Sequence, residues 1–532
     1  MAEIPGEGFT EAERAALAPH FTDLDGPVFA LTDLPEVVKG ALFARYSRSP
    51  KSLRRLWLDE FGGAGSTSAV ARAVDTRRAE QLYEKVFVEY GDDSVAQLGG
   101  VHLAVEGASN ILTKILEWGR LMAYLEQSTR YIPYDDRPGG RWRYHVPAEL
   151  TGALRERYAR TLDGTFATYA AWLPRLRAHF ERVYPRADDD SETAYRMTIR
   201  AKALDTLRGL LPAATISNVG VYGTAQAYEQ LLLRMRAHPV AEARSCADAM
   251  LRELRKVIPA FLERVDAPAR GGVWSAYLAE TRAAVQEAAA GVLAKTRPEP
   301  RDEVTLTEFD PDGEVKVVAA ALYAVSALPD DQLVGVARRL TDAERVSVLN
   351  AYVGKRRNRR HRPGRAFERT AYRFDLLADY GAFRDLQRHR LLTLEWQRLS
   401  PAHGYVLPEA VIEAGAEADF RAVMEESAAV HDAIVAAGMP DVASYAVSMA
   451  FRVRFYMAMN AREAMHVIEL RSAPQGHPSY RRIAQRMHRL IAEQAGHHAI
   501  ASAMTYADHS HVALERLAAE KAAERRRHRE QP

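Results

Sequence analysis

Apolar residues recur along this chain mostly at helical spacing, and they mark out several long amphipathic segments. Segments with this spacing are 81–90, 101–131, 152–183, 191–210, 371–386 and 391–400. Residues 91–94, Gly-Asp-Asp-Ser, have the composition of a turn that ends in a helix N-cap. The charged residues 514–532 predict a solvated helix that frays into a tail. The pattern therefore predicts a chain rich in long helices.

Two stretches of the chain repeat each other at a fixed distance. Lys39 and Tyr46 of the first stretch are matched by Lys316 and Tyr323 of the second, each 277 positions later. A period of this length indicates a duplicated domain rather than a solenoid. At 532 residues the chain is also too long for one ordinary core.

The domain boundaries follow from this duplication. The Pro- and charge-rich residues 295–303 (KTRPEPRDE) have the composition of a linker. We therefore expect a first unit at 1–294, a second unit at 304–513 and a charged helical tail at 514–532.

Composition narrows the class of protein. The 72 Lys and Arg residues nearly balance the 70 Asp and Glu residues, which argues against a general nucleic-acid-binding surface. Cys246 is the single cysteine, so an intrachain disulfide and a Cys cluster for zinc or iron–sulfur are both excluded. No apolar run approaches the roughly 20 residues of a membrane span, and the N-terminus does not resemble a signal peptide. We expect a soluble cytoplasmic protein.

The most informative stretch is Gln387-Arg388-His389-Arg390, where three cationic or protonatable side chains follow an apolar segment. Arg384 lies four residues before Arg388 and shares its face of the expected helix. Burying this much positive charge is costly unless an anion or an electron-rich ring lies against it. The alternative is a solvated arginine face on a surface helix.

Three motifs in order resemble the flavin-dependent thymidylate synthases. An R-H-R triplet begins at Arg388, Glu368 lies 20 residues before it, and an N-A-R…L-R run spans residues 460–471. The resemblance implies an α/β (α+β) fold of two fused units, each with a mixed sheet and long helices. It implies that FAD is bound by Glu368, Arg388, His389, Arg390, Asn460, Arg462 and His466.

The resemblance also assigns catalysis to arginines. Arg471 would stabilise negative charge that develops on the uracil ring of dUMP, and such preorganised charge is worth a few kcal/mol. Arg388 and Arg390 would act with it by holding the flavin. The chemistry requires no cysteine nucleophile, because the reduced flavin supplies the reducing equivalent. The family's other substrates are methylenetetrahydrofolate and NADPH.

The two copies keep different halves of the family's site. The first copy has the Ser-x-Arg-Tyr motif at residues 128–131, but Trp118, Gly119 and Arg120 stand at the triplet positions. In the second copy Ser400-Pro401 replaces Arg-Tyr, and Ser444 replaces a phosphate-contacting arginine that is Arg208 in the first. The nucleotide-binding residues that the resemblance implies are Glu126, Gln127, Ser128, Arg130, Arg208 and Arg471.

This complementarity leads to a composite-site hypothesis. The second copy would supply the flavin contacts, and the first copy would supply the phosphate contacts. Because the family's sites lie between subunits of a homotetramer, the chain is expected to form a homodimer that acts as a pseudo-tetramer. The alternative for Arg130 and Arg208 is a surface ion pair, and for His389 and His466 a structural histidine.

A basic cluster at residues 355–365 suggests a further anion contact. We interpret it as a rim for an anionic cofactor, with RNA binding as the alternative, although it lacks the interleaved aromatics that stack on bases. Pro363 and Arg365 replace the His and Ser/Thr of a turn that lies beside the flavin in the family, which weakens the case for folate and NADPH.

Three functions are compatible with these motifs. The first is FAD-dependent methylation of dUMP to dTMP with methylenetetrahydrofolate and NADPH. The second is a related flavoprotein that acts on another pyrimidine nucleotide. The third is a non-catalytic flavin- or nucleotide-binding protein.

Overall fold

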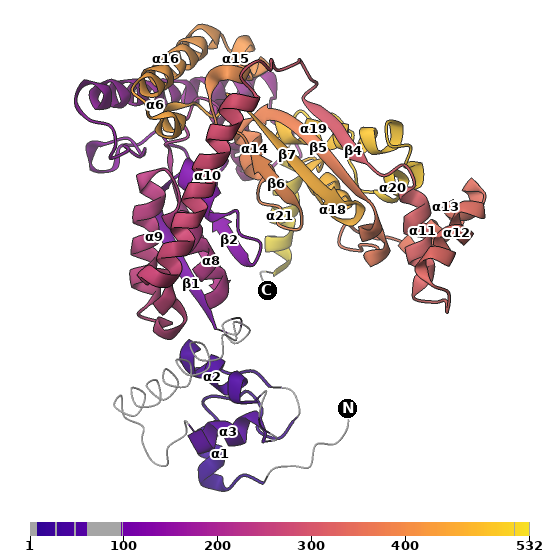
Figure 1. Cartoon of the computed structure of the whole chain (residues 1–532). Helices are drawn as coiled ribbons and strands as arrows, with labels where there is room; N and C mark the ends of the chain where they lie inside the picture. Colours follow the sequence, from indigo (N-terminus) through magenta and orange to yellow (C-terminus); the bar gives the residue numbers. More distant parts are fainter. Residues whose placement is uncertain are drawn as a thin grey trace. The chain divides into compact units, whose positions relative to one another are not determined.

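The computed structural model describes residues 8–26, 29–46, 49, 51–60, 97, 99–514 and 516–530. The chain forms two compact units (Figure 1). The first comprises Met1–Glu106, Leu121–Glu126 and Asn218–Thr296. The second comprises Gly107–Arg120, Gln127–Ser217 and Arg297–Pro532, so it combines both halves of the chain. The helix and turn expected at 81–90 and 91–94 lie outside the described residues.

The first unit contains a sheet with the strand order β1-β3-β2, although β1 and β3 each extend by a few residues into the second unit. Strand β2 runs antiparallel to β3, with Met122 opposite Gly223 and Glu126 opposite Val219. The strands are β1 (Gly100–Ser109), β2 (Met122–Glu126) and β3 (Ile216–Thr224). The α-helices are α1 (Glu11–Leu17), α2 (Glu36–Tyr46), α3 (Leu53–Glu60), α8 (Ala225–Arg236), α9 (Ala241–Leu254) and α10 (Val273–Val292), with short η4 (Pro259–Val265) and η5 (Pro268–Gly272).

The second unit contains an antiparallel sheet with the order β4-β5-β7-β6 (Figure 1). Side chains of β5 and β7 alternate between buried and less buried positions, and Tyr372, Phe374 and Leu376 enter the core. Helix α19 packs against β4 and β5. The strands are β4 (Val304–Phe309), β5 (Ala371–Asp379), β6 (Thr393–Trp396) and β7 (Arg452–Asn460).

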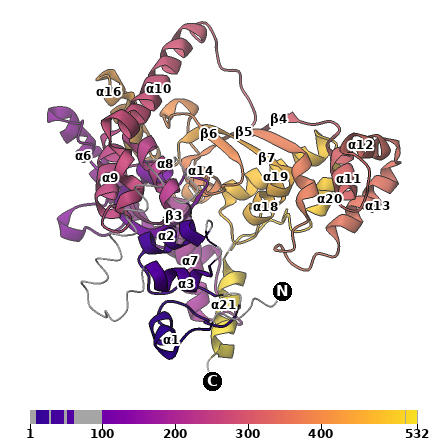
Figure 2. The same cartoon turned by 60° about the horizontal axis from the view of Figure 1, so that its bottom comes forward.

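The unit that contains this sheet also contains helices from both copies (Figure 2). The first copy supplies α5 (Asn110–Leu116), η3 (Pro138–Gly140), α6 (Gly152–Val183) and α7 (Glu192–Leu207). The second supplies α11 (Gly313–Tyr323), α12 (Asp330–Arg339), α13 (Asp342–Val353), η6 (Arg365–Arg369), α14 (Tyr380–Leu386), η7 (Pro401–His403), α15 (Glu409–Glu413), α16 (Glu417–Ala436), α17 (Pro440–Ala443), η8 (Ser444–Ala446), α18 (Ala461–Arg471), α19 (Pro478–Glu493), α20 (His498–Ala503) and α21 (Leu517–Glu530). No described helix combines the length and apolarity that a membrane crossing needs.

The α/β fold class is confirmed, and the described strand registers are antiparallel rather than mixed. The order β1-β3-β2 of the first copy matches β5-β7-β6 of the second, as expected for a duplication. Residues 295–303 contain no helix or strand and connect α10 with β4. The predicted boundaries at 294 and 304 remain predictions, because the two compact units do not follow the two copies.

The helix predictions were confirmed in part. The helix at 152–183 is α6, and the one at 191–210 is the shorter α7, capped by Ser191 Oγ. The charged tail forms α21, but it is not simply solvated. Ser191, the N-cap of α7, donates to Glu524, and Lys521 pairs with Asp189 in the turn before α7.

Three of the helix predictions were wrong, because each segment contains a strand. Residues 101–131 form β1, α5 and β2, residues 371–386 form β5 and α14, and residues 391–400 contain β6. In the first two segments the physical reason is a capping residue in the middle: Ser109 Oγ accepts from Leu112 N, and Asp379 Oδ1 accepts from Ala382 N. Each cap begins a short helix directly after a strand whose apolar residues alternate. The third segment contains a strand and no helix.

A local two-fold axis relates the two copies inside the second unit. Pro212 and Ser448, equivalent positions 236 residues apart, form an isolated antiparallel bridge. Four backbone hydrogen bonds of 2.8–3.0 Å surround it, from Ala213 N to Val447 O, Met449 N to Leu211 O, Ala214 N to Tyr445 O and Ala450 N to Gly209 O. Exchanging the copies maps each bond onto another of the four.

The bridge requires a close approach at Gly209. A Cβ atom added to this glycine would lie 3.0 Å from the Ala450 Cβ and 3.6 Å from Phe420 Cζ. We expect Gly209→Ala to lower the free energy of unfolding by about 1–3 kcal/mol through overpacking. Urea unfolding would measure this change.

Gly164 on α6 is the matched control, because an added Cβ there meets nothing within 4 Å. Gly164→Ala is expected to leave stability unchanged or to raise it by about 1 kcal/mol. Equal effects of the two substitutions would contradict the close approach at the bridge.

Candidate functional site

Arginines from both copies converge on one buried carboxylate of the second unit, Asp385 at the end of α14. Arg208 Nη1 donates to Asp385 Oδ2 at 3.2 Å, and Arg388 Nη1 lies 3.8 Å from Oδ1. Asp385 is buried, which by itself raises its pKa, but Arg388, Arg208, Arg471 and Arg130 together hold that pKa well below its ordinary value. Asp385 is therefore an ionised centre within a cationic site.

Arg208 has hydrogen-bonding capacity to spare. It lies at the C-terminal end of α7, its side chain is buried, and its Nη2 lies 3.9 Å from Asp379 Oδ1. This Nη2 is buried without a hydrogen-bond partner. Gly381 makes room for the guanidinium, because a Cβ atom there would lie 2.9 Å from Arg208 Nε. A buried orphan N–H of arginine is suited to an anionic ligand.

Arg130 forms an ion pair within the first copy and a hydrogen bond to a tyrosine of the second copy. Its Nε and Nη2 donate to Asp205 of α7 at 2.8 and 2.6 Å, and its Nη1 donates to Tyr480 Oη at 3.0 Å. The guanidinium of Arg471 lies 5.4 Å from the centroid of the same tyrosine ring. His477 donates to Asp205 O at 3.3 Å. Tyr480 thus stands between predicted nucleotide-binding residues of both copies.

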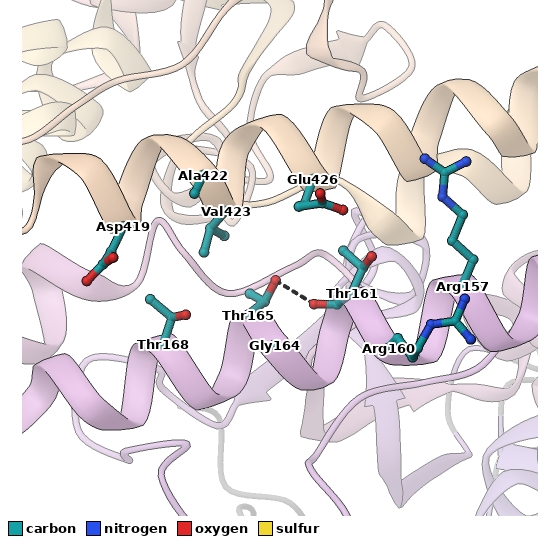
Figure 3. Close-up of a pocket in the computed structure, with 10 residues that line it drawn as sticks. All are labelled: Arg157, Arg160, Thr161, Gly164, Thr165, Thr168, Asp419, Ala422, Val423 and Glu426. Carbon is teal, nitrogen blue, oxygen red and sulfur yellow. Dashed lines mark hydrogen bonds between the residues drawn. The ribbon is translucent and has the colours of Figure 1, made fainter.

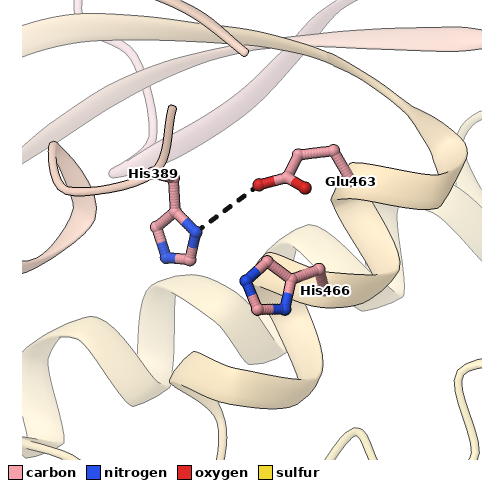
Figure 4. A group of neighbouring side chains, drawn as sticks. All are labelled: His389, Glu463 and His466. Atoms are coloured by element: carbon pink, nitrogen blue, oxygen red, sulfur yellow. Dashed lines mark ion pairs between the residues drawn. The ribbon is translucent and has the colours of Figure 1, made fainter. Parts of the chain in front are cut away.

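Arg471 is tied to the triplet by His389. Arg471 Nε donates to His389 Nε2 at 2.9 Å, and Glu463 Oε1 lies 3.6 Å from His389 Nδ1 (Figure 4). His466 lies on the same helix as Glu463, and its ring centroid is 5.3 Å from that of His389. Burial, together with the charges of Arg471, His466 and Arg362, lowers the pKa of His389 well below its ordinary value. The histidine is therefore neutral.

His389, Glu463 and His466 bring ligand atoms within 4.8 Å of one another, as a metal site would. The hydrogen bonds do not fit a metal. Arg471 donates to one nitrogen of His389 and Arg362 Nη2 contacts Nδ1 of His466 at 2.9 Å, so the remaining nitrogens carry the protons. A metal-binding histidine has the reverse arrangement, with its free nitrogen donating outward.

The remaining flavin-side predictions occupy the same region. Arg388 and Arg390 are exposed on either side of the buried His389. Glu368 Oε2 accepts from Arg365 at 3.0 Å, and its Oε1 lies 3.6 Å from Arg462 Nη1. Asn460 caps α18, because its Oδ1 accepts from Glu463 N.

Three predicted nucleotide-side residues have less direct roles. Ser128 Oγ accepts from Arg130 N at 3.2 Å and so shapes the local turn. The Gln127 carbonyl accepts from Ser217 Oγ. Glu126 is buried at the end of β2, which belongs to the first unit.

The basic cluster at 355–365 is partly structural. Arg356 is buried, pairs with both carboxylate oxygens of Glu469 and donates to Ala503 O. Arg362 contacts His466, as described above, whereas Arg357 and Arg360 are exposed. One member of the cluster thus contacts a neighbour of His389, and other members present positive charge outward.

A separate groove lies between α6 and α16, with a volume of about 630 Å³ (Figure 3). Arg157 and Arg160 line it from α6, and Asp419 and Glu426 line it from α16. Its described lining residues carry both charges, and none of them has a buried polar atom without a hydrogen-bond partner. The groove therefore shows no clear preference for a ligand.

Comparison with known proteins decides the family. Residues 42–260 and 305–495 each match the family described as thymidylate synthase complementing protein. The chain belongs to this family. The two matched regions correspond to the two copies. The candidate site of this thymidylate synthase complementing protein family member contains residues from both copies.

The relatives fall into two groups. A UPF0159 protein of Chlamydia muridarum is 37% identical over 96% of this chain and 97% of its own length. A UPF0159 protein of Thermoplasma acidophilum is 29% identical over 91% of this chain and 97% of its own. The flavin-dependent thymidylate synthase of Mycobacterium sp. (strain JLS) is 29% identical over 38% of this chain and 77% of its own.

The triplet positions of the first copy of this family member are used for packing. Trp118 Nε1 donates to Leu394 O at 3.3 Å, and its ring meets that of Trp396 edge-on with centroids 6.3 Å apart. Arg120 Nη2 donates to Thr393 Oγ1 at 3.0 Å. The two acceptors and the Trp396 ring all belong to β6. Trp118 and Arg120 therefore hold this strand in place.

Sequence reasoning missed the acidic and aromatic members of the site. Asp205, Asp385, Tyr480 and Glu463 were not predicted as site residues. Asp205 lies 75 residues from Arg130, and no local pattern could pair them. Glu463 could have been found, since it lies three residues before His466 and therefore shares its helix face.

Burial of His477 predicts a specific acid sensitivity. Burial lowers the pKa of His477 to about 3, and the nearby Arg208 and Arg130 act in the same direction. Because the unfolded histidine takes up its proton near pH 6.5, the free energy of unfolding should fall as pH drops from about 6.5 to about 3. His477→Asn should reduce this fall in the free energy of unfolding, which urea unfolding at several pH values would measure. His511→Asn, at an exposed position, is the control, and equal slopes for the two variants would exclude His477 as the cause.

Proposed function

We propose that this chain is an FAD-dependent thymidylate synthase that methylates dUMP to dTMP, with methylenetetrahydrofolate as carbon donor and NADPH as reductant. The observation that carries this proposal is the convergence of Arg130 and Arg208 from the first copy with Arg388 and Arg471 from the second. Family membership and the similarity to mycobacterial flavin-dependent thymidylate synthases support it. We also propose that the protein is a cytoplasmic homodimer.

The nucleotide phosphate would bind Arg208 and Arg130. Arg208 offers a buried Nη2 without a hydrogen-bond partner, and arginine binds phosphate through parallel charge-assisted hydrogen bonds. Burial raises the pKa of Asp379, which reduces the negative charge opposing a phosphate. Four guanidinium groups then face Asp205 and Asp385, which leaves positive charge for an anionic ligand.

The residues present also fit FAD. Arg388 and Arg390 are exposed on both sides of His389, where an anionic dinucleotide would find two cations. Bound FAD supplies the reducing equivalent of this chemistry. Arg471, half-buried beside Tyr480 and His389, would be in a position to stabilise negative charge on the pyrimidine ring.

One observation favours the second candidate, a flavoprotein that acts on another pyrimidine nucleotide. Ser400-Pro401 stands where the second copy should carry Arg-Tyr, and Arg365 occupies the flavin-side turn, paired with Glu368. Both substitutions leave Arg130 and Arg208 in place. Different nucleotide monophosphates would compete for the same arginines.

The visible absorption spectrum of the protein with FAD, before and after dUMP, tests the proposal. A bound-flavin spectrum that shifts with dUMP is expected and would justify assaying tritium release from C5. A bound-flavin spectrum that does not change with dUMP but shifts with another pyrimidine nucleotide would support the second candidate. Absence of flavin binding would contradict both.

Arg130 provides a test of the composite site. Arg130→Ala should weaken dUMP binding by at least about tenfold, because a guanidinium charge beside the phosphate is lost. Arg120→Ala is the control, because Arg120 stands in the triplet that has turned to packing. Isothermal titration calorimetry would measure both affinities. Equal affinity of Arg130→Ala and the unsubstituted protein would rule out a nucleotide site composed from both copies.

The loss of complementary motifs also predicts stoichiometry. Trp118 and Ser444 occupy positions held by Arg388 and Arg208 in the proposed site, so the second, symmetry-related position has no phosphate contacts of this kind. The same titration should give one dUMP per chain. A value of two would show that the related position still binds nucleotide.

A further inference from the structure

Glu463 is a buried carboxyl group that the family resemblance does not assign. It lies in the first turn of α18, its exposed fraction is 5%, and it faces His389 (Figure 4). His389 in turn accepts from Arg471, the residue that would stabilise charge on the nucleotide ring. The three side chains form a continuous line of polar contacts of 3.6 and 2.9 Å.

The tautomer of His389 follows from its two neighbours. An arginine Nε–H is always a donor, so His389 Nε2 accepts and the imidazole proton lies on Nδ1. Nδ1 points to the Glu463 carboxylate, which is an acceptor when ionised. At 3.6 Å the ionised carboxylate favours a proton on Nδ1 through its charge, and this tautomer leaves Nε2 available to Arg471.

We propose that Glu463 is a positioning residue, which acts through His389 to hold Arg471 in place for the bound nucleotide. The inference rests on the proposed function, but the His389 tautomer is a property of the protein alone. Without Glu463, the imidazole is free to turn over or to move its proton. Arg471 then meets an N–H group in place of an acceptor.

The charges around Glu463 make this role pH-dependent. Arg462 and His466 face it from its own helix, Arg362 from the loop before η6, and His389 from the loop after α14. Burial raises the pKa of Glu463 to about 7, although Arg362 and Arg462 oppose this shift. The carboxylate therefore prevails above pH 7, and below it the protonated group no longer serves as a full acceptor for Nδ1–H.

Two substitutions of Glu463 separate its role as a hydrogen-bond acceptor from its charge. Glu463→Gln keeps an amide oxygen that accepts from Nδ1–H but does not titrate, whereas Glu463→Ala removes the acceptor. Glu425→Gln on α16 is the control, because Glu425 is exposed and lies outside the site. His389→Asn assigns the His389 resonances.

The first measurement is the ¹⁵N shift of the His389 ring nitrogens in ¹⁵N-histidine-labelled protein at pH 8. We expect the Nδ1–H tautomer in the unsubstituted protein, in Glu463→Gln and in Glu425→Gln, and its loss in Glu463→Ala. An Nε2–H tautomer in the unsubstituted protein would overturn the proposal, whether or not flavin binds.

The second measurement is dUMP affinity of the FAD-loaded protein between pH 6 and pH 9. We expect Glu463→Ala to bind about tenfold more weakly at pH 8. Glu463→Gln should match the unsubstituted protein at pH 8 and lose the decline below pH 7. Full affinity in Glu463→Ala, or an unchanged decline in Glu463→Gln, would overturn the proposal. If the unsubstituted protein binds no dUMP, the proposed function fails and the tautomer alone decides the role of Glu463.

Discussion

The antiparallel bridge between Pro212 and Ser448 is the constraint on which the candidate site depends. Its hydrogen bonds are ordinary in strength, about 0.5–1.5 kcal/mol each, but they fix the register of one copy on the other. Arg208 lies four residues before the bridge, and Gly381 N donates to Met449 O within it. The same backbone contacts that join the copies therefore bring Arg208 to the Gly381 surface and to Asp385.

The two-fold axis relates each site position in one copy to an equivalent position in the other, but different residues occupy the two. Arg208 has Ser444 as its counterpart, and Ser444 Oγ donates to Leu399 O inside the fold. Arg388 has Trp118 as its counterpart, which packs on β6. A gene fusion permits this difference because each copy can change alone, whereas identical subunits must change together. One position gains cationic side chains and the other gains packing.

Family spacing singled out arginines that the structure brings together, but not the carboxylates that pair with them. Spacing relative to the family motifs located Arg130, Arg208, Arg388 and Arg471, and the structure brings all four near Asp385. Their acidic partners depend on contacts between distant segments, which no periodicity encodes. The strands were misread for a related reason: Asp379 ends a strand and caps a helix, so one apolar segment contains two periods.

The proposed anion site contains carboxylates because its guanidinium groups are buried and need partners of opposite charge when no ligand is bound. An unpaired buried charge is costly, so the ligand-free fold must neutralise its arginines from within. Asp205 takes two donors of Arg130, and Asp385 takes one donor of Arg208. The neutralisation is incomplete, since Arg208 Nη2 keeps no hydrogen-bond partner. A phosphate would supply that partner without displacing Asp385, so the fold can be stable when empty and still retain a driving force for the nucleotide.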